Sequence, residues 1–304
     1  MRIYLVRHGE TVHNVAQAWA GATDSALTNH GMLQIECLAQ HFMKKSIRLD
    51  WVFASDLSRA RITAEGICRL QPPTPDGVPL CPVLTRELRE RDFGSLEGLR
   101  WQPASFNSGS TSASSGSSSD GATATHVDKE STVSMRQRAN SFLHSHFLPV
   151  VFDSGCLHPN IAIVAHGIIL RVLWNCLVEL FDPMNISLLP GVATWNGGPA
   201  ALISPSWSNT GVMELLIQRN SGMQPPQDVG SHVPQAALSS AIEATPSPKS
   251  TQEEYLQNTL LHGWSMSIQA IDNKAHLSGL RRTRGGIGSA SHDTKQKKID
   301  QFFK

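Results

Sequence analysis

The sequence predicts an α/β fold with a mostly parallel central sheet that helices cover on both faces. Apolar runs at residues 3–6 and 160–165 are nearly continuous, as in strands buried on both sides. Segments with helical spacing of apolar residues lie between such runs along residues 1–219. Strands that alternate with helices are typical of a parallel sheet.

The first half of this region contains three strands and two helices. After the opening strand, apolar residues recur at helical spacing in residues 27–45: Met32, Ile35, Ala39 and Phe42. A short buried strand follows at 50–55. A helix at 56–70 then begins after Ser55 and Asp56, which are residue types that cap helices. A brief strand and a charged loop complete this half at residues 83–98.

The second half repeats the alternation. Residues 130–152 predict a helix, and residues 160–166 form a second apolar strand that leads into a buried helix at 167–181. Two final strands are expected at 191–204 and 211–219. We therefore place one catalytic domain at residues 1–219.

Two stretches are too polar to bury the apolar surface that ordering requires. The Ser/Gly-rich residues 103–128 are interpreted as a disordered insertion in the domain. Residues 220–304 are interpreted as a mostly disordered tail, with one helix candidate at 251–271 and a docking peptide at 296–303.

Composition limits the classes of function. The net charge of +1 over 304 residues excludes a general polyanion binder, so we expect no direct nucleic-acid contact except through the basic residues 272–304. The cysteines form no CxxC pair, which argues against a disulfide framework and a cysteine-rich zinc site. The first strand leaves no room for a signal peptide, and the apolar stretch 161–181 contains polar residues. We expect a soluble protein of the nucleus or cytoplasm without membrane contact.

Charged side chains and imidazoles follow the ends of two predicted strands. Arg7 and His8 come directly after the first strand, and His166 follows a later one. Because the carboxyl ends of parallel strands meet at one sheet edge, we expect both histidines to lie together there. Arg59 at a helix start and Glu90 in a loop add a guanidinium and a carboxyl group. Such a mostly cationic set suits a phosphate dianion.

These residue types are sufficient for the hydrolysis of a phosphomonoester without a metal or cofactor. A neutral histidine whose second nitrogen is held by a backbone carbonyl can take the phosphoryl group. Arginines offset the charge on the equatorial oxygens. A carboxyl group protonates the leaving alkoxide and later deprotonates the attacking water.

Five segments occur in one order along residues 1–219: "LVRHGETVHN", "LTNHG", "SDLSRARITAE", "LRERDFGSLEG" and "VAHG". Together they resemble the histidine phosphatase superfamily, also called phosphoglycerate mutase-like. The resemblance implies that His8 is the phosphorylated nucleophile and Glu90 the proton donor. It further implies that three side chains bind the transferring phosphate: Arg7, Arg59 and His166.

The same resemblance makes Asn14 a phosphate contact and Gly21 and Gly167 donors of backbone N–H groups. This sequence also departs from the family's mutases. Their basic substrate loop is replaced by the serine-rich insertion, and "WAG" at residues 19–21 stands where they have "FTG". Both departures favour a phosphatase that acts on a small phosphorylated substrate. Phosphoglycerate mutase-type transfer remains the alternative.

The C-terminus contains a separate pattern. Apolar residues and a glutamine in "QKKIDQFFK" are spaced for one tight helical turn: Gln296, Ile299, Phe302 and Phe303. This resembles the peptide (PIP-box-like) by which many nuclear proteins dock on the replication sliding clamp. The alternative for this peptide is that the end is amphipathic by chance and packs on its own domain. The alternative for the whole protein is a nuclear clamp-interacting protein whose phosphatase fold is only a module.

Overall fold

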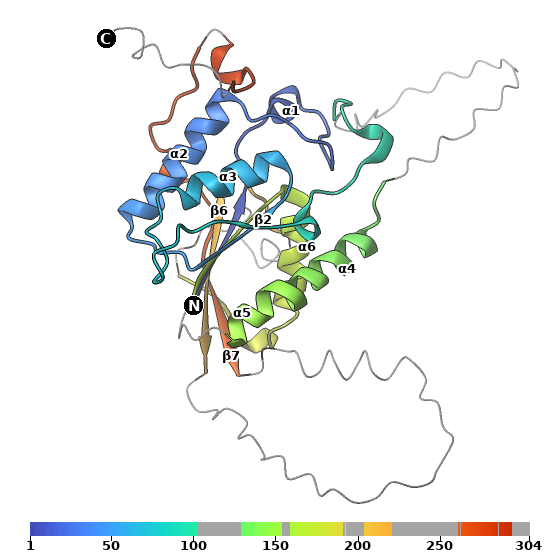
Figure 1. The fold of residues 1–304 in the computed structure, drawn as a ribbon. Coiled ribbons are helices and arrows are strands. Elements are labelled where there is room, and N and C mark those ends of the chain that lie inside the picture. Colours follow the sequence, from blue (N-terminus) through green and yellow to red (C-terminus); the bar gives the residue numbers. More distant parts are fainter. Residues whose placement is uncertain are drawn as a thin grey trace, which may run out of the picture.

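The computed structural model describes residues 1–101, 129–153, 159–190, 192, 204–220, 261, 263–284 and 286–293. One seven-stranded sheet in the order β3-β2-β4-β1-β6-β7-β5 runs through these residues (Figure 1). Its strands are β1 (Arg2–Arg7), β2 (Trp51–Ser55), β3 (Val83–Thr85), β4 (Asn160–Ala165), β5 (Ile186–Leu188), β6 (Val212–Arg219) and β7 (Trp264–Asn273). The helices are α1 (Val12–Ala16), α2 (Asn29–Lys44), α3 (Ser58–Cys68), α4 (Thr132–Phe142), α5 (Leu148–Asp153) and α6 (Gly167–Val178).

The sheet is mostly parallel, as the sequence predicts. β1 pairs with β4, β4 with β2, and β2 with β3, all in parallel. The strand β6 is antiparallel to both β1 and β7, while β5 is parallel to β7. The four parallel strands therefore direct their carboxyl ends toward one edge, where ligands of α/β sheets bind.

Helices cover both faces, and the alternation of side chains along β1 shows why. Ile3 and Leu5 pack in one core cluster with side chains of α4 and α6. Tyr4 and Val6 point to the opposite face and pack in a second cluster with α2 and α3. A strand buried on both faces carries no polar positions in its centre, which explains its continuous apolar run.

The helices predicted within residues 1–219 are present, with one correction at the start of α3. Ser55 and Asp56 do not cap this helix. Leu57 stands at the cap position, and Asp24 from a distant loop accepts the hydrogen bond from the backbone N–H of Ser58 at 2.8 Å. Asp56 instead binds the guanidinium of Arg89 through both oxygens. Tertiary contacts thus replaced the local cap.

The predicted helix at 130–152 forms as α4 and α5, joined by a π-helical turn at Leu143–Phe147. The segment between β4 and residue 181 forms α6, as expected. The short strand β5 and the helix α1 were not predicted, because three- and five-residue elements leave little periodicity in the sequence.

The proposed boundary at residue 219 is wrong, because β7 belongs to the central sheet. The helix candidate at 251–271 is wrong for residues 264–271, which form most of this strand. Met266 and Ile268 are 0% exposed and lie on one face of the sheet, whereas the intervening Ser267 is only partly buried. Burial of every second residue is the pattern of a strand. The hydrogen bonds of this strand to β6 outweighed the helical spacing of apolar residues in the sequence.

The residues after β7 also return to the domain. Backbone bonds join Asn29 to Ala290 and His292 to Leu27. Arg282, which lies in the part of the chain predicted to be a mostly disordered tail, binds both carboxylate oxygens of Glu10, one of them at 2.8 Å. Glu10 is two residues past His8, so this C-terminal segment (residues 275–293) braces the loop that follows β1.

Several sequence predictions lie outside the described residues: the disordered insertion at 103–128, most of the strand at 191–204, the disordered tail over 221–250, residues 251–260 of the helix candidate, and the docking peptide at 296–303. Within the described ranges, no helix combines the length and apolar character needed to cross a membrane.

The placement of β7 is testable by core truncation. Replacing Ile268 by Ala is expected to lower the free energy of unfolding by about 3 kcal/mol, because the variant leaves a cavity in the sheet core. The neighbouring Gln269→Ala substitution lies at a partly buried position and serves as the control. Urea denaturation measures the stability of both variants. Equal midpoints for Ile268→Ala and wild type would contradict the place of residues 264–273 in the sheet.

Candidate active site

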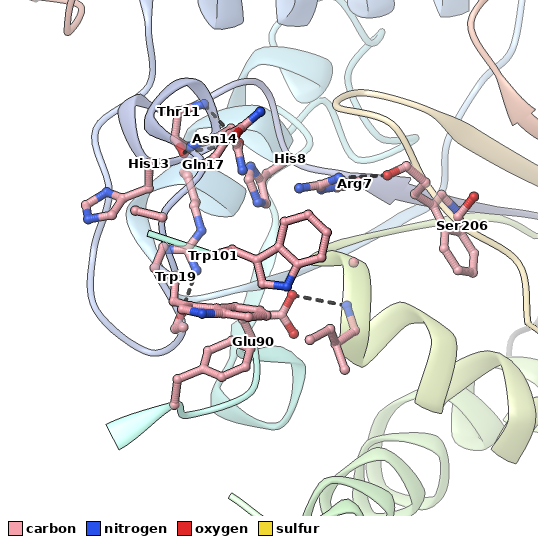
Figure 2. Close-up of a pocket in the computed structure, with 18 of the residues that line it drawn as sticks. Arg7, His8, Thr11, His13, Asn14, Gln17, Trp19, Glu90, Trp101 and Ser206 are labelled. Atoms are coloured by element: carbon pink, nitrogen blue, oxygen red, sulfur yellow. Dashed lines mark hydrogen bonds between the residues drawn. The ribbon is translucent and has the colours of Figure 1, made fainter. Parts of the chain in front are cut away.

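The sheet edge at the ends of β1 and β4 contains a hollow of about 540 Å³ (Figure 2). The register pairs Arg7 with Ala165, and the backbone N–H of His8 donates to the carbonyl of Ala165 at 3.0 Å. His8 and His166 therefore leave adjacent strands at the same level. Their ring centroids are 5.0 Å apart, so the two imidazoles converge as the sequence predicts.

His8 presents one unprotonated nitrogen. Its Nδ1 lies 2.7 Å from the carbonyl oxygen of Gly9, and a carbonyl only accepts, so the proton of the neutral ring is on Nδ1. The lone pair is then on Nε2. Burial lowers the pKa of His8 well below its usual value, and the guanidiniums of Arg59 and Arg7 lower it further. The ring is held as a neutral base with a fixed tautomer.

Arg7 brings a buried positive charge to the hollow. Its Nη1 donates to the carbonyl of Trp207 at 2.8 Å. Its Nε is buried and meets no acceptor within the described residues. Burial lowers the pKa of Arg7, while the carboxylates of Glu90 and Asp272 act in the opposite direction. A buried donor without a protein acceptor at the wall of a hollow favours an anionic ligand.

Arg59 extends from the first turn of α3 and is 1% exposed. Its Nη2 and Nη1 donate to the carbonyls of Gly21 at 2.6 Å and Thr23 at 2.9 Å. Its Nε donates to Nδ1 of His166 at 3.1 Å. Burial lowers its pKa to about 10, so the group keeps its charge at neutral pH.

Gly21 lines the hollow, and its N–H contact with a phosphate stays a prediction. Its carbonyl accepts from Arg59. The residue has φ +54°, and a Cβ there would stand 1.9 Å from Oε1 of Glu97. A side chain is therefore excluded both by the left-handed backbone and by the carboxylate beside it.

His166 lies beside the hollow with both ring nitrogens engaged. Nδ1 accepts from Arg59, and Nε2–H donates to the hydroxyl of Ser55 at 2.9 Å. Burial lowers its pKa well below the usual value, and Arg59 and His8 contribute. The structure thus brings His166 to the predicted place but in contact with Arg59, so that it orients the guanidinium.

Glu90 faces the hollow from the loop after β3 (Figure 2). Its Oε2 accepts from the N–H of Ile168 at 3.1 Å, and its Oε1 accepts from the N–H of Ile169 at 3.2 Å. The N–H of Arg91 also donates to Oε1. The carboxyl group is therefore fixed at the N-terminus of α6, across the hollow from His8.

The remaining predicted contacts line the same hollow. Asn14 uses its Oδ1 to accept from the backbone of Thr11 and from Nδ2 of Asn209, which leaves its amide N–H groups for a ligand. Gly167 begins α6 and also borders the hollow. All of the predicted phosphate-site residues except His166 line the hollow itself.

Sequence reasoning missed the rim of the site. Trp19, Phe93, Trp101, Arg171 and Ser206 also line the hollow. Trp101 stands at the start of the serine-rich stretch, and nothing in its spacing indicates a site. Among the described residues, no group of three or more His, Cys, Asp or Glu side chains is arranged to hold a metal ion.

The family model described as the histidine phosphatase superfamily (branch 1) matches residues 3–187, which is more than half of the chain. The chain belongs to the histidine phosphatase superfamily. The match includes His8, Arg59, Glu90 and His166. The phosphoglycerate mutase-like resemblance of the sequence is thereby confirmed at the level of the superfamily.

Individual relatives match over shorter or weaker stretches. "Probable phosphatase C1687.21" of Schizosaccharomyces pombe is 35% identical over 99 residues, which cover 33% of this chain and 44% of the relative. A "2,3-bisphosphoglycerate-dependent phosphoglycerate mutase" of Methylobacterium sp. is 28% identical over 208 residues, covering 65% and 88%. A solved structure titled "Mycobacterial hydrolase 1" is 19% identical with a TM-score of 0.47, covering 73% and 92%. The chain spans less than half the length of the first curated relatives it matches.

The buried imidazoles predict a pH-dependent stability. A ring that stays neutral when folded but takes up a proton when unfolded favours the unfolded state as the pH falls. We expect the free energy of unfolding to fall below about pH 6.5, by about 1.4 kcal/mol per pH unit for each ring, down to the lowered folded pKa values. Urea denaturation at pH 7.5, 6.5 and 5.5 measures this slope. The double variant His8→Asn/His166→Asn should have a smaller slope of stability against pH. The control His144→Asn changes an exposed histidine and should keep the wild-type slope. An unchanged slope in the double variant would contradict the assignment.

Proposed function

We propose that this protein is a metal-independent phosphomonoester phosphatase (a phosphoric monoester hydrolase) that works through phospho-His8. The observation that supports the proposal best is the hydrogen bond from Nδ1 of His8 to the Gly9 carbonyl, which leaves Nε2 as the nucleophile. The guanidiniums of Arg7 and Arg59 stand around the same hollow. The family relationship and the phosphatase relatives in yeast give further support.

In the first step, Nε2 of His8 attacks phosphorus and the bond from phosphorus to the ester oxygen breaks. Arg7 and Arg59 offset the charge on the three equatorial oxygens, and His166 holds the guanidinium of Arg59 in place. The acid form of Glu90 gives its proton to the departing alkoxide. The products are the alcohol and a phosphohistidine.

In the second step, Glu90 accepts a proton from water as the water attacks phosphorus. The bond between phosphorus and Nε2 breaks, and inorganic phosphate leaves. His8 returns to the neutral form with its proton on Nδ1, which the Gly9 carbonyl has held throughout. The same carboxyl group thus serves as acid and then as base.

A mutase of Methylobacterium is also among the relatives, so phosphoglycerate mutase-type transfer is the second candidate. We favour hydrolysis because the serine-rich residues 103–128 stand where the mutases of the family have a basic substrate loop. The lining of the hollow adds indole rings and a third arginine, Arg171, to the two arginines of the phosphate site. Isotope exchange between phosphoglycerates separates the two, since a mutase exchanges the label faster than it releases phosphate.

The nucleophile is tested by rapid quench with a ³²P-labelled phosphomonoester. Wild type should accumulate acid-labile phosphate, and peptide mapping should locate the label on His8. The His8→Ala variant should lose at least about 10³-fold in kcat, because removing a covalent nucleophile leaves only positioning and charge stabilisation. Wild-type turnover by His8→Ala would eliminate this mechanism.

Glu90→Gln is expected to reduce kcat by about 10²-fold for alkyl phosphates and much less for 4-nitrophenyl phosphate, whose leaving group needs no proton. The amide also replaces one acceptor of the N–H bonds from Ile168 and Ile169. Circular dichroism and the thermal midpoint control for any loss of structure. Equal losses on both substrates would refute the acid role.

We also propose that residues 296–303 dock on the replication sliding clamp, on the sequence pattern alone. A peptide of residues 290–304 should bind the clamp with a micromolar Kd in a calorimetric titration. Phe302→Ala/Phe303→Ala should abolish binding, whereas Lys304→Ala should retain most of it. No heat at high micromolar peptide would exclude the clamp as the partner.

A further inference from the structure

The mouth of the active-site hollow is built from indole rings (Figure 2). Trp19 and Trp101 are 82 residues apart in the chain, and both line the hollow that contains His8. Trp101 is 52% exposed, although an indole is among the side chains that gain most from burial. In the view of Figure 2, its ring is drawn between His8 and Glu90, which line the same hollow.

Backbone pairing holds these rings at the mouth. The N–H of Trp19 donates to the carbonyl of Leu99 at 3.0 Å, and the N–H of Gly98 donates to the carbonyl of Trp19 at 2.7 Å. The N–H of Trp101 donates to Gln17. Residues 17–19 and 98–101 thus form a short antiparallel pair, with a bridge between Ala18 and Arg100. Trp101 is exposed on a fixed backbone rather than on a free end.

The rings of Trp19 and Trp101 lie nearly at right angles and form an indole corner. Trp19 packs on Phe93 with centroids 4.3 Å apart, so its position is set by the protein. Trp101 stands perpendicular to Trp19, at 86° and 6.4 Å between centroids. A third planar ring that stacks on the face of Trp101 would turn its edge toward Trp19. Stacked and edge-to-face contacts are the two favoured aromatic geometries, and this corner provides both.

The chemistry of the hollow therefore changes from one end to the other. His8 and Arg59 are 4% and 1% exposed, so the part of the hollow where the phosphate would bind is its inner end. Trp101 is 52% exposed, so the indole rings lie toward the mouth. The indole faces offer few hydrogen-bond partners to a polyhydroxy or carboxylate leaving group, although the lining also contains polar side chains: Thr11, His13, Gln17, Arg171 and Ser206. A flat apolar group would bury surface on both rings.

We propose that the substrate is a phosphomonoester whose leaving group carries a planar aromatic ring, which stacks on Trp101 while the phosphate contacts His8 and the arginines. This rests on the proposed phosphatase function. The ring could belong to an aryl group close to the phosphate or to a nucleobase one sugar away, and both present the same π face to the indole corner.

Two matched substrate pairs separate ring recognition from leaving-group reactivity. Benzyl phosphate and cyclohexylmethyl phosphate are primary alkyl esters of equal size, one planar and one puckered. Adenosine 5′-monophosphate and ribose 5-phosphate differ only in the base. We expect kcat/KM to favour the aromatic member of at least one pair by about tenfold. The pair with the larger ratio shows whether the ring is an aryl group or a nucleobase.

The variant Trp101→Ala should bring the favoured ratio close to one, and Trp101→Phe should keep part of it. Leu99→Ala is the matched control, because Leu99 lies in the same segment, is 56% exposed and is not part of the lining of the hollow. It should keep the wild-type ratio. Ratios near one for both pairs in wild type, or an unchanged ratio in Trp101→Ala, would overturn the proposal.

Calorimetry with benzylphosphonate and (cyclohexylmethyl)phosphonate, which cannot be hydrolysed, distinguishes this proposal from the proposed function. Tighter binding of benzylphosphonate that depends on Trp101 supports the aromatic site, even if no ester is hydrolysed and the phosphatase proposal fails. Hydrolysis of all four esters without aromatic preference, together with equal phosphonate affinities, leaves the phosphatase function standing and removes the aromatic site.

Discussion

The parallel register between β1 and β4 is the constraint on which the candidate site depends. Because Arg7 pairs with Ala165, the two residues that follow, His8 and His166, emerge side by side. The backbone bond from His8 to Ala165 extends the ladder one residue beyond the strands. A slip of one residue would turn one imidazole to the opposite face of the sheet and separate the pair. The apolar centre of each strand fixes this register by burying both faces.

Buried cations need compensation, and this protein supplies it mainly through carbonyl groups. Arg59 donates to Gly21 and Thr23, and Arg7 donates to Trp207. Glu90 is the carboxylate that acts on both guanidiniums. Carbonyl acceptors stabilise the arginines without cancelling their charge, so the hollow stays electropositive toward an arriving dianion.

The loop of residues 17–24 connects the two ends of the hollow. Its Gly21 and Thr23 hold Arg59 at the base, while Trp19 pairs with residues 98–99 at the mouth. Asp24 caps α3, the helix that carries Arg59. Arg282, near the C-terminus, donates a hydrogen bond to Glu10 and thereby stabilises the loop that follows His8. Phosphate site, mouth and C-terminal segment therefore form one hydrogen-bonded unit.

The sequence by itself determined the features that are local in the chain. Continuous apolar runs specified β1 and β4, periodic ones specified α2 and α6, and the motifs around His8, Arg59, Glu90 and His166 specified which residues would meet. The roles of these residues, the insertion and the docking peptide remain predictions.

Tertiary structure decided what depends on partners far along the chain. Whether residues 264–271 became a helix or a strand was set by the free edge of β6, which no local spacing reports. The cap of α3 came from Asp24 rather than from its own preceding residues. Trp101 acquired a place at the mouth only through backbone bonds to a loop 82 residues earlier. Local spacing encodes which face of an element is apolar, but the partner that covers that face is chosen by packing of the whole chain.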